Sequence, residues 1–403
     1  MPGVRPISKS KIIFPLSKIS FDLLTNILSF VIKHEDGQVF ETQVLYVNRT
    51  WAKAVVPHIW SHVYIIEPTQ QHALLYLLRS SPDQLMFNYG AMIRSVTICP
   101  VSISNMKPGG LLRSLKVLRE NLPNLKKLHV EDKLSFCHVC HVGKEATTMQ
   151  VGKLLCVKGL KELKLDSNHW TFNDELLEII MPTMTGGLNR LSINGENFTD
   201  EGIVEYVIPN LKEDLIEFSA EHRGLNPVLI TGHSILALLS SCRNLKRMSL
   251  EGIYLHDQDF LIDELPESNL KHLTLGKVSP QDFTTFGLRS LLLTCHKTLV
   301  SLVLDMDHIS QTVLQDIIIP LFHRSQLEEL HLVSESWAAW TAHYPRPRYE
   351  HELRAKEAMW RWKMKAYWGL SNELIRLVGK KVKTLRVFSI LGENHLNRAI
   401  TQF

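Results

Sequence analysis

The chain has 403 residues, of which 45% are hydrophobic and 21% charged, a composition typical of a globular protein with a large core. Its formal net charge of +4 is small for this length and does not indicate a dedicated nucleic-acid-binding protein. Six cysteines do not make a disulfide framework, and no run of about 20 apolar residues marks a membrane span. We therefore expect an intracellular protein, cytoplasmic or nuclear, that binds neither nucleic acid nor membranes.

Residues 12–60 are predicted to form three short helices. The apolar positions of the first recur at helical spacing: Ile19, Leu23, Leu24, Ile27 and Leu28. Ser20 is a suitable N-cap, a polar gap at 33–38 follows, and a second helix starts near Thr42. A third includes Val47–Trp51, and Pro57 is expected to end it. Because this unit has a small core, it is expected to dock onto something else.

Three segments carry a family resemblance: ISFDLLTNILSF at Ile19–Phe30, VNRTW at Val47–Trp51 and PHIW at Pro57–Trp60. In this order they resemble an F-box, although Ile19-Ser20 replaces the usual Leu-Pro. The resemblance implies binding to the Skp-type adaptor of SCF ubiquitin ligases and, through it, to a cullin. It implies adaptor contacts from one set of side chains: Ile19, Leu23, Leu24, Ile27 and Leu28. Each buried Leu or Ile could contribute about 1.5–3 kcal/mol. The alternative is a helical cap over the end of the following domain.

The rest of the chain, residues 61–403, repeats an LxxLxL frame at the spacing of leucine-rich repeats. The predicted frames are Ile93/Val96/Ile98, Leu125/Leu128/Val130, Leu160/Leu163/Leu165, Leu188/Leu191/Ile193, Leu215/Phe218/Ala220, Leu245/Met248/Leu250, Leu270/Leu273/Leu275, Leu299/Leu302/Leu304, Leu327/Leu330/Leu332 and Val382/Leu385/Val387. Trp60, Val63 and Ile65 already fit the frame, so we expect the first helices to be joined rigidly to the repeats.

The stretch Leu188–Tyr206 shows what one repeat should contain. Its frame predicts a strand, Asn194-Gly195 a turn, and Thr199 the N-cap of a helix. Such a unit buries its apolar face only against copies of itself. The fold class is therefore α/β, a leucine-rich-repeat solenoid with parallel strands on the concave face and helices on the convex face. An ordinary α/β domain with leucine-rich strands is the alternative.

One insertion, at about 334–380, interrupts the repeats and holds five of the eight tryptophans. Trp337 and Trp340 lie in an irregular stretch that is a candidate target-binding element. A helical, basic segment at 348–367 follows, which could bind nucleic acid or an acidic partner, or could pack against the last repeats. We favour packing for this segment.

The third, fifth and seventh positions of each frame should face the concave side. The third column alternates in charge, and lateral pairing between neighbouring strands is expected: Lys127, Glu162, Arg190, Glu217 and Arg247. The fifth column is small and polar, which leaves room for a target: Ser192, Ser219, Ser249 and Thr274. The seventh is mostly acidic, either for a basic ligand or simply as solvated surface: Glu131, Asp166, Asn194, Glu221, Glu251, Gly276 and Asp305. The speculative target-binding residues are Ser192, Ser219, Glu221, Ser249, Glu251, Thr274, Trp337 and Trp340.

No nucleotide-binding loop, GxSxG or HExxH motif is present, so the chain is not expected to be an enzyme or to need a cofactor. Cys137, Cys140 and His141 form a CxxCH motif, which is a haem-attachment pattern or half of a zinc site. A paired second set of ligands is missing, and a loop without ligand is the favoured interpretation.

Two functions follow. The F-box-like segment followed by repeats resembles F-box/leucine-rich-repeat proteins, which are non-catalytic substrate receptors of SCF-type ubiquitin ligases. In that case the repeats would bind a protein substrate that the sequence does not identify. The alternative is a leucine-rich-repeat interaction scaffold with no link to ubiquitination.

Overall fold

The computed structural model describes residues 49–65, 68–80, 85, 87–98, 110–131, 148–166, 172–194, 196–222, 229–253, 266–278, 285–306, 313–323, 325–334, 372–392 and 399–400. Several predicted site residues lie outside the described residues: Ile19, Leu23, Leu24, Ile27, Leu28, Cys137, Cys140, His141, Trp337 and Trp340.

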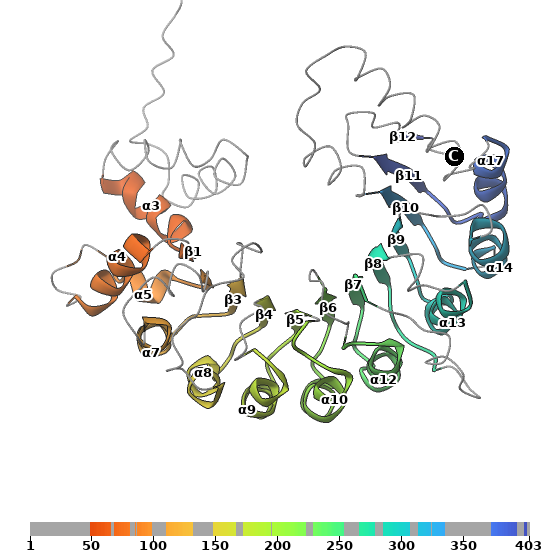
Figure 1. Ribbon diagram of the computed structural model, residues 1–403. Coiled ribbons are helices and arrows are strands. Elements are labelled where there is room, and N and C mark those ends of the chain that lie inside the picture. Colours follow the sequence, from red (N-terminus) through yellow and green to blue (C-terminus); the bar gives the residue numbers. More distant parts are fainter. Residues whose placement is uncertain are drawn as a thin grey trace, which may run out of the picture.

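The described strands form one 12-stranded sheet in which each strand pairs with the next in the sequence. The strands are β1 His62–Ile65, β2 Ser95–Ile98, β3 Lys127–Glu131, β4 Glu162–Asp166, β5 Arg190–Asn194, β6 Glu217–Glu221, β7 Arg247–Glu251, β8 His272–Val278, β9 Ser301–Met306, β10 Glu329–Ser334, β11 Val387–Gly392 and β12 Ala399–Ile400. Pairing is parallel from β1 to β11, and β12 pairs antiparallel with β11. The strands line the inner side of an arc and the helices its outer side (Figure 1). The predicted leucine-rich-repeat solenoid is confirmed.

Helices or short helical turns connect most of these strands on the convex side. Their bounds are α3 Arg49–Ile59, α4 Pro68–Arg79, α5 Tyr89–Met92, α7 Gly110–Asn121, α8 Thr148–Leu155, α9 Asp174–Met184, α10 Asp200–Gly202, η3 Ile203–Val207, α11 Ile208–Leu211, α12 Gly232–Ser241, α13 Thr285–Cys295, η5 Val313–Ile318, α14 Ile319–Phe322 and α17 Asn372–Lys381. The last of these, α17, lies at the end of the range predicted as the insertion.

The repeat at β5 shows how the frame builds the core. Leu191 and Ile193 alternate with exposed or half-buried residues along the strand, and each is 1% exposed. Ile203 and Val207 of η3 close the core from the helical side, each at 0% exposure. Since a buried side chain of this size contributes about 1.5–3 kcal/mol, the stacked repeats share a continuous core that no single repeat could form.

A ladder of backbone hydrogen bonds joins successive repeats at the N-terminal ends of the strands. The carbonyl of Asn189 accepts from the amides of Ile216 and Glu217, at 2.8 and 3.0 Å. The carbonyl of Ile216 in turn accepts from Lys246 and Arg247, at 2.9 and 3.1 Å. The same arrangement recurs from the carbonyl of Ser61 to that of Glu328. The backbone amides at the strand starts are therefore hydrogen-bonded along the described arc, because each repeat supplies the acceptor carbonyl for the next.

A second ladder joins the helix starts. Asp174 accepts from the amide and the hydroxyl of Thr199, at 3.0 and 2.5 Å, and Thr199 caps α10 by accepting from the amide of Gly202. Asp200 repeats this contact with Thr231, at 2.8 and 2.5 Å. Each threonine thus caps its own helix while its hydroxyl donates to an aspartate of the previous repeat. The predicted N-cap role of Thr199 is confirmed.

Two convex helices contain a π-helical segment directly before an Ile-Pro pair. η3 precedes Ile208-Pro209, and η5 precedes Ile319-Pro320. A proline has no amide hydrogen, and its ring clashes with the carbonyl four residues earlier, so a widened turn relieves the conflict without ending the helix.

Two predicted boundaries are wrong. Pro57 does not end its helix, because α3 continues to Ile59 with Pro57 in the last turn, where one lost hydrogen bond is tolerated. The last repeat frame also lies three residues later than predicted. The β10–β11 register places Phe388 opposite Leu330 and Ile390 opposite Leu332, and Val387 is 41% exposed. Two overlapping apolar triplets satisfy the LxxLxL spacing here, so spacing alone could not choose between them.

Candidate protein-interaction surface on the concave sheet

The third column of the repeats forms the ion-pair row that the sequence predicted. It consists of Lys127, Glu162, Arg190, Glu217 and Arg247, which are register partners on β3 to β7. Glu162 accepts from Lys127 at 2.8 Å and from Arg190 at 3.5 Å. Glu217 lies 3.3 Å from Arg190 and 3.7 Å from Arg247. Each interior member has partners on both sides, so both glutamates of the row are neutralised within it.

Glu162 is the most strongly held member of this row. Its Oε1 also lies 2.8 Å from Nε2 of His129 on β3. Burial of the Glu162 carboxyl opposes its ionisation, but the hydrogen bonds and charges of Lys127 and His129 outweigh burial and lower its pKa from the ordinary 4.5. The His129 imidazole is therefore engaged by this carboxylate.

The row changes character at β8, where His272 follows Arg247 in register. Burial lowers the pKa of His272 from the ordinary 6.5, and the charge of Arg247 lowers it further. The imidazole is thus favoured in its neutral form, and the alternation of charges ends at this strand.

The fifth column forms a hydroxyl row along the middle of the sheet. Ser192, Ser219, Ser249 and Thr274 are consecutive register partners on β5 to β8, and all four are half-buried. Lys164 precedes this row on β4, and Val303 follows it on β9. Small side chains between longer ones leave room for side chains of a bound protein, and each hydroxyl can donate one hydrogen bond and accept others.

The seventh column differs from its prediction as a row of surface acids. Asp166 and Asn194 are buried, at 7% and 2% exposure. Lys164 lies 3.6 Å from Asp166, and the Asn194 side chain accepts from the amide of Glu196 at 3.0 Å. Both side chains therefore make local contacts at the ends of β4 and β5 instead of facing solvent. Residue type and spacing alone could not predict this burial.

Glu221 and Glu251 remain as a half-buried acidic pair in register on β6 and β7. The next register partner is Gly276 on β8, and a Cβ there would lie 2.8 Å from Cγ of Glu251. Glu251 therefore lies over the space left by the missing side chain. The two glutamates place negative charge beside the hydroxyl row.

Two buried polar atoms near the C-terminal ends of β5 and β6 were not predicted from the sequence. Oε1 of Glu196 and Nδ1 of His222 have no hydrogen-bond partner among the described residues. They lie just after β5 and β6, in the segments that follow the strands. A charged residue directly after a repeat frame was the available signal, but many loop residues share it.

The described residues contain no group of three or more metal-binding side chains. Cys242 and Cys295 are buried and unpaired, as expected of small apolar residues. Burial raises the pKa of Cys242 to about 11 and that of Cys295 to about 12, so both stay protonated and unreactive at neutral pH. No helix of the described segments is long and apolar enough to cross a membrane.

Comparison with known proteins finds distant likenesses among solved structures. No family model matches the sequence. The chain is similar to one in the crystal structure of the Rad7 and Elc1 complex in yeast, with 14% identity, coverage of 96% of this chain and 88% of that chain, and a TM-score of 0.43. It is also similar to the leucine-rich-repeat-containing protein LegL7 from Legionella pneumophila, with 9% identity, coverage of 61% and 85%, and a TM-score of 0.34. Both likenesses are distant, and the fold assignment rests on the repeat geometry itself.

Proposed function

We propose that the chain is a non-catalytic substrate receptor of an SCF-type ubiquitin ligase. Its N-terminal helices would hold the Skp-type adaptor, and the concave sheet would hold the target protein. The F-box-like order of Ile19–Phe30, Val47–Trp51 and Pro57–Trp60 before a repeat solenoid carries this proposal.

The junction between α3 and the first repeat supports a receptor of fixed geometry. Trp60 follows α3 directly and packs on Tyr89 of α5, with ring centroids 4.6 Å apart. Ser61 then accepts from the amides of Arg94 and Ser95, at 3.0 and 2.9 Å, so it is the first rung of the backbone ladder. No flexible linker separates α3 from β1. A partner held near α3 would therefore keep a fixed relation to the sheet.

Adaptor binding is tested by pull-down of the full chain with a purified Skp-type adaptor. Leu24→Asp with Ile27→Asp should abolish retention, because two buried apolar contacts would become charged. Tyr76→Asp with Met149→Asp is the matched control, since these side chains are 74% and 51% exposed on α4 and α8. Absence of retention by the unchanged chain, or equal retention by the Leu24/Ile27 variant, would contradict the proposal.

Target binding on the sheet is tested separately, by affinity purification with mass spectrometry. Glu221→Lys with Glu251→Lys should remove a target from the purified set, while adaptor retention stays unchanged. Glu205→Lys with Glu213→Lys makes the same change of charge at exposed positions away from the sheet face. If every partner survives reversal of Glu221 and Glu251, the acidic pair is surface without a target role.

One observation favours the alternative of an interaction scaffold without ubiquitin chemistry. Ala54, Val55 and Val56 of α3 are at most 5% exposed, and this helix contacts α5 in the first repeat. A cap needs no adaptor. The scaffold predicts a chain that is stable and monodisperse alone and that ignores the adaptor, which size-exclusion chromatography of the two purified proteins would show.

A further inference from the structure

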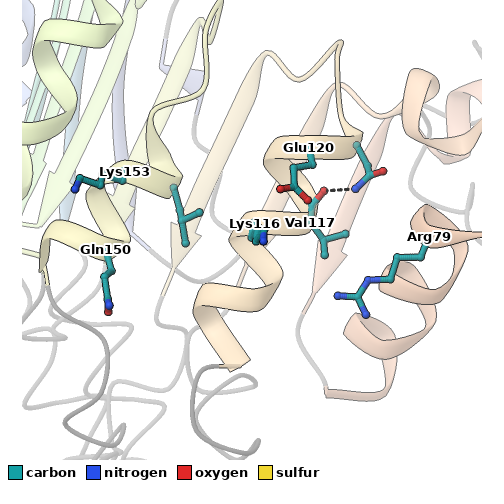
Figure 2. Close-up of a pocket in the computed structure, with 8 residues that line it drawn as sticks. Arg79, Lys116, Val117, Glu120, Gln150 and Lys153 are labelled. Carbon is teal, nitrogen blue, oxygen red and sulfur yellow. Dashed lines mark hydrogen bonds between the residues drawn. The ribbon is translucent and has the colours of Figure 1, made fainter.

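A groove on the convex face has a composition unlike that of the sheet. It lies between α4, α7 and α8, in the first repeats, with a volume of about 790 Å³. Its lining residues are Arg79, Lys116, Val117, Glu120, Asn121, Gln150, Lys153 and Leu154. Figure 2 shows Arg79 extending from α4 towards α7, which carries Lys116 and Glu120. Three helices from three different repeats therefore converge on one hollow.

The residues that line this groove carry more positive than negative charge. Arg79, Lys116 and Lys153 are all exposed, and none forms an ion pair with any residue in the described segments. Glu120 is the one acidic residue among the eight that line the groove. The helix dipole favours positive charge in a last turn, which accounts in part for Arg79 and Lys153. Lys116 lies in the interior of α7, where the dipole gives no such reason.

The walls of the groove are fixed. Arg119 donates from Nη1 to the carbonyl of Lys153 at 2.7 Å, which links α7 to α8. Asn121 donates to the carbonyl of Val117 at 2.9 Å. Leu154 is half-buried, so the lining includes apolar surface beside the cations. A ligand would meet a preformed surface rather than one it must order.

We propose that this groove binds an acidic segment of a partner protein. Carboxylates of that segment would lie beside Arg79, Lys116 and Lys153, and one of its apolar side chains would pack on Leu154. Charge complementarity and the mixed lining select this occupant. A single-stranded nucleic acid would need aromatic rings for stacking, and the eight lining residues include none.

This inference is independent of the proposed adaptor and target sites. The groove is on the helical side of the arc, whereas the candidate target surface is on the sheet side (Figure 1). The chain could therefore hold an acidic partner and a target at the same time.

The test is a fluorescence-anisotropy titration of the full chain with a short labelled peptide of glutamate and leucine. Lys116→Glu with Lys153→Glu should weaken binding by about tenfold or more, because attraction becomes repulsion. Lys380→Glu with Lys381→Glu is the matched control, since both residues are exposed in the last turn of α17 at the other end of the arc. This control should change affinity by no more than about twofold, since screening leaves little effect beyond about 10 Å. Thermal melting confirms that each variant is folded.

Further arms separate the contributions. A peptide of glutamine and leucine should bind weakly, and Leu154→Asn should weaken the acidic peptide without altering its salt dependence. No binding of the acidic peptide, or equal loss in the Lys380/Lys381 control, would overturn the proposal. A DNA duplex or oligothymidine that displaces the peptide and binds more tightly would identify a nucleic-acid surface instead, and would overturn it too.

Discussion

The two faces of the solenoid use similar cations in opposite ways. On the sheet, Arg190 and Arg247 are 47% and 53% exposed at their side chains, and both are paired with glutamates of neighbouring strands. In the convex groove, Lys116 and Lys153 are also exposed but have no carboxylate partner among the described residues. Exposure is similar in both regions, and the difference lies in compensation.

This contrast follows from the geometry of repeats. Strands about 5 Å apart bring equivalent positions together in register, so opposite charges in one column pair laterally. Convex helices are farther apart and differ in length, and their charges do not meet in register. Charge on the sheet therefore contributes to the fold, whereas charge between the helices remains available to a partner.

The largest effect is expected from the core beneath the ion-pair row. Phe218 of β6 is 0% exposed, and Phe218→Ala should reduce the free energy of unfolding by about 3–5 kcal/mol through lost burial and a cavity. Phe218→Leu should cost clearly less. Urea denaturation measures both. Equal stability of the alanine variant and the unchanged chain would contradict the burial of Phe218 in the core beneath the ion-pair row.

A smaller effect is expected within the row. Glu162→Gln should lower the free energy of unfolding by about 1 kcal/mol, because the carboxylate accepts from Lys127, His129 and Arg190. Glu120→Gln in the convex groove should leave stability unchanged within about 0.5 kcal/mol. The same denaturation assay measures both variants. If Glu162→Gln and Glu120→Gln lower the free energy of unfolding by the same amount, ion pairing in the row contributes nothing to folding.

The smallest effect concerns pH. The folded-state pKa of His272 is lowered, so the unfolded chain takes up a proton first and stability falls as pH drops below about 6.5. The pKa of Glu162 is also lowered, so its contribution is present above about 4.5 and is lost as pH falls through its folded-state pKa. The melting temperature should therefore depend less on pH just below about 6.5 in His272→Gln. In Glu162→Gln it should depend less on pH below about 4.5. An unchanged pH profile in both variants would contradict these directions.

The sheet was largely predictable from the sequence, and the reason is its period. The buried frames and the ion-pair row depend only on spacing and on register between equivalent residues. The last frame was misplaced because a second apolar triplet fits the spacing around Leu385. The buried state of Asp166 and Asn194 depends on the segments after the strands, where the period gives no information.

The convex groove could not be predicted. Arg79, Lys116 and Lys153 lie at different positions in their helices, which are joined to the strands by segments of irregular length, so no common repeat position relates them. Space in the groove also depends on the angles between α4, α7 and α8, which the sequence does not encode in any simple pattern. The same holds for Gly276, whose role appears only once Glu251 is seen beside it.

The most direct test compares neutralised pairs of cations from the two faces for binding of the labelled glutamate–leucine peptide. Lys116→Gln with Lys153→Gln should weaken binding several-fold, about what the loss of two unpaired charges predicts. Arg190→Gln with Arg247→Gln removes the same charge from the sheet and should leave peptide affinity unchanged, because those arginines are already paired. Equal weakening by the two pairs would contradict the claim that compensation, rather than exposure, decides which charges a partner can use.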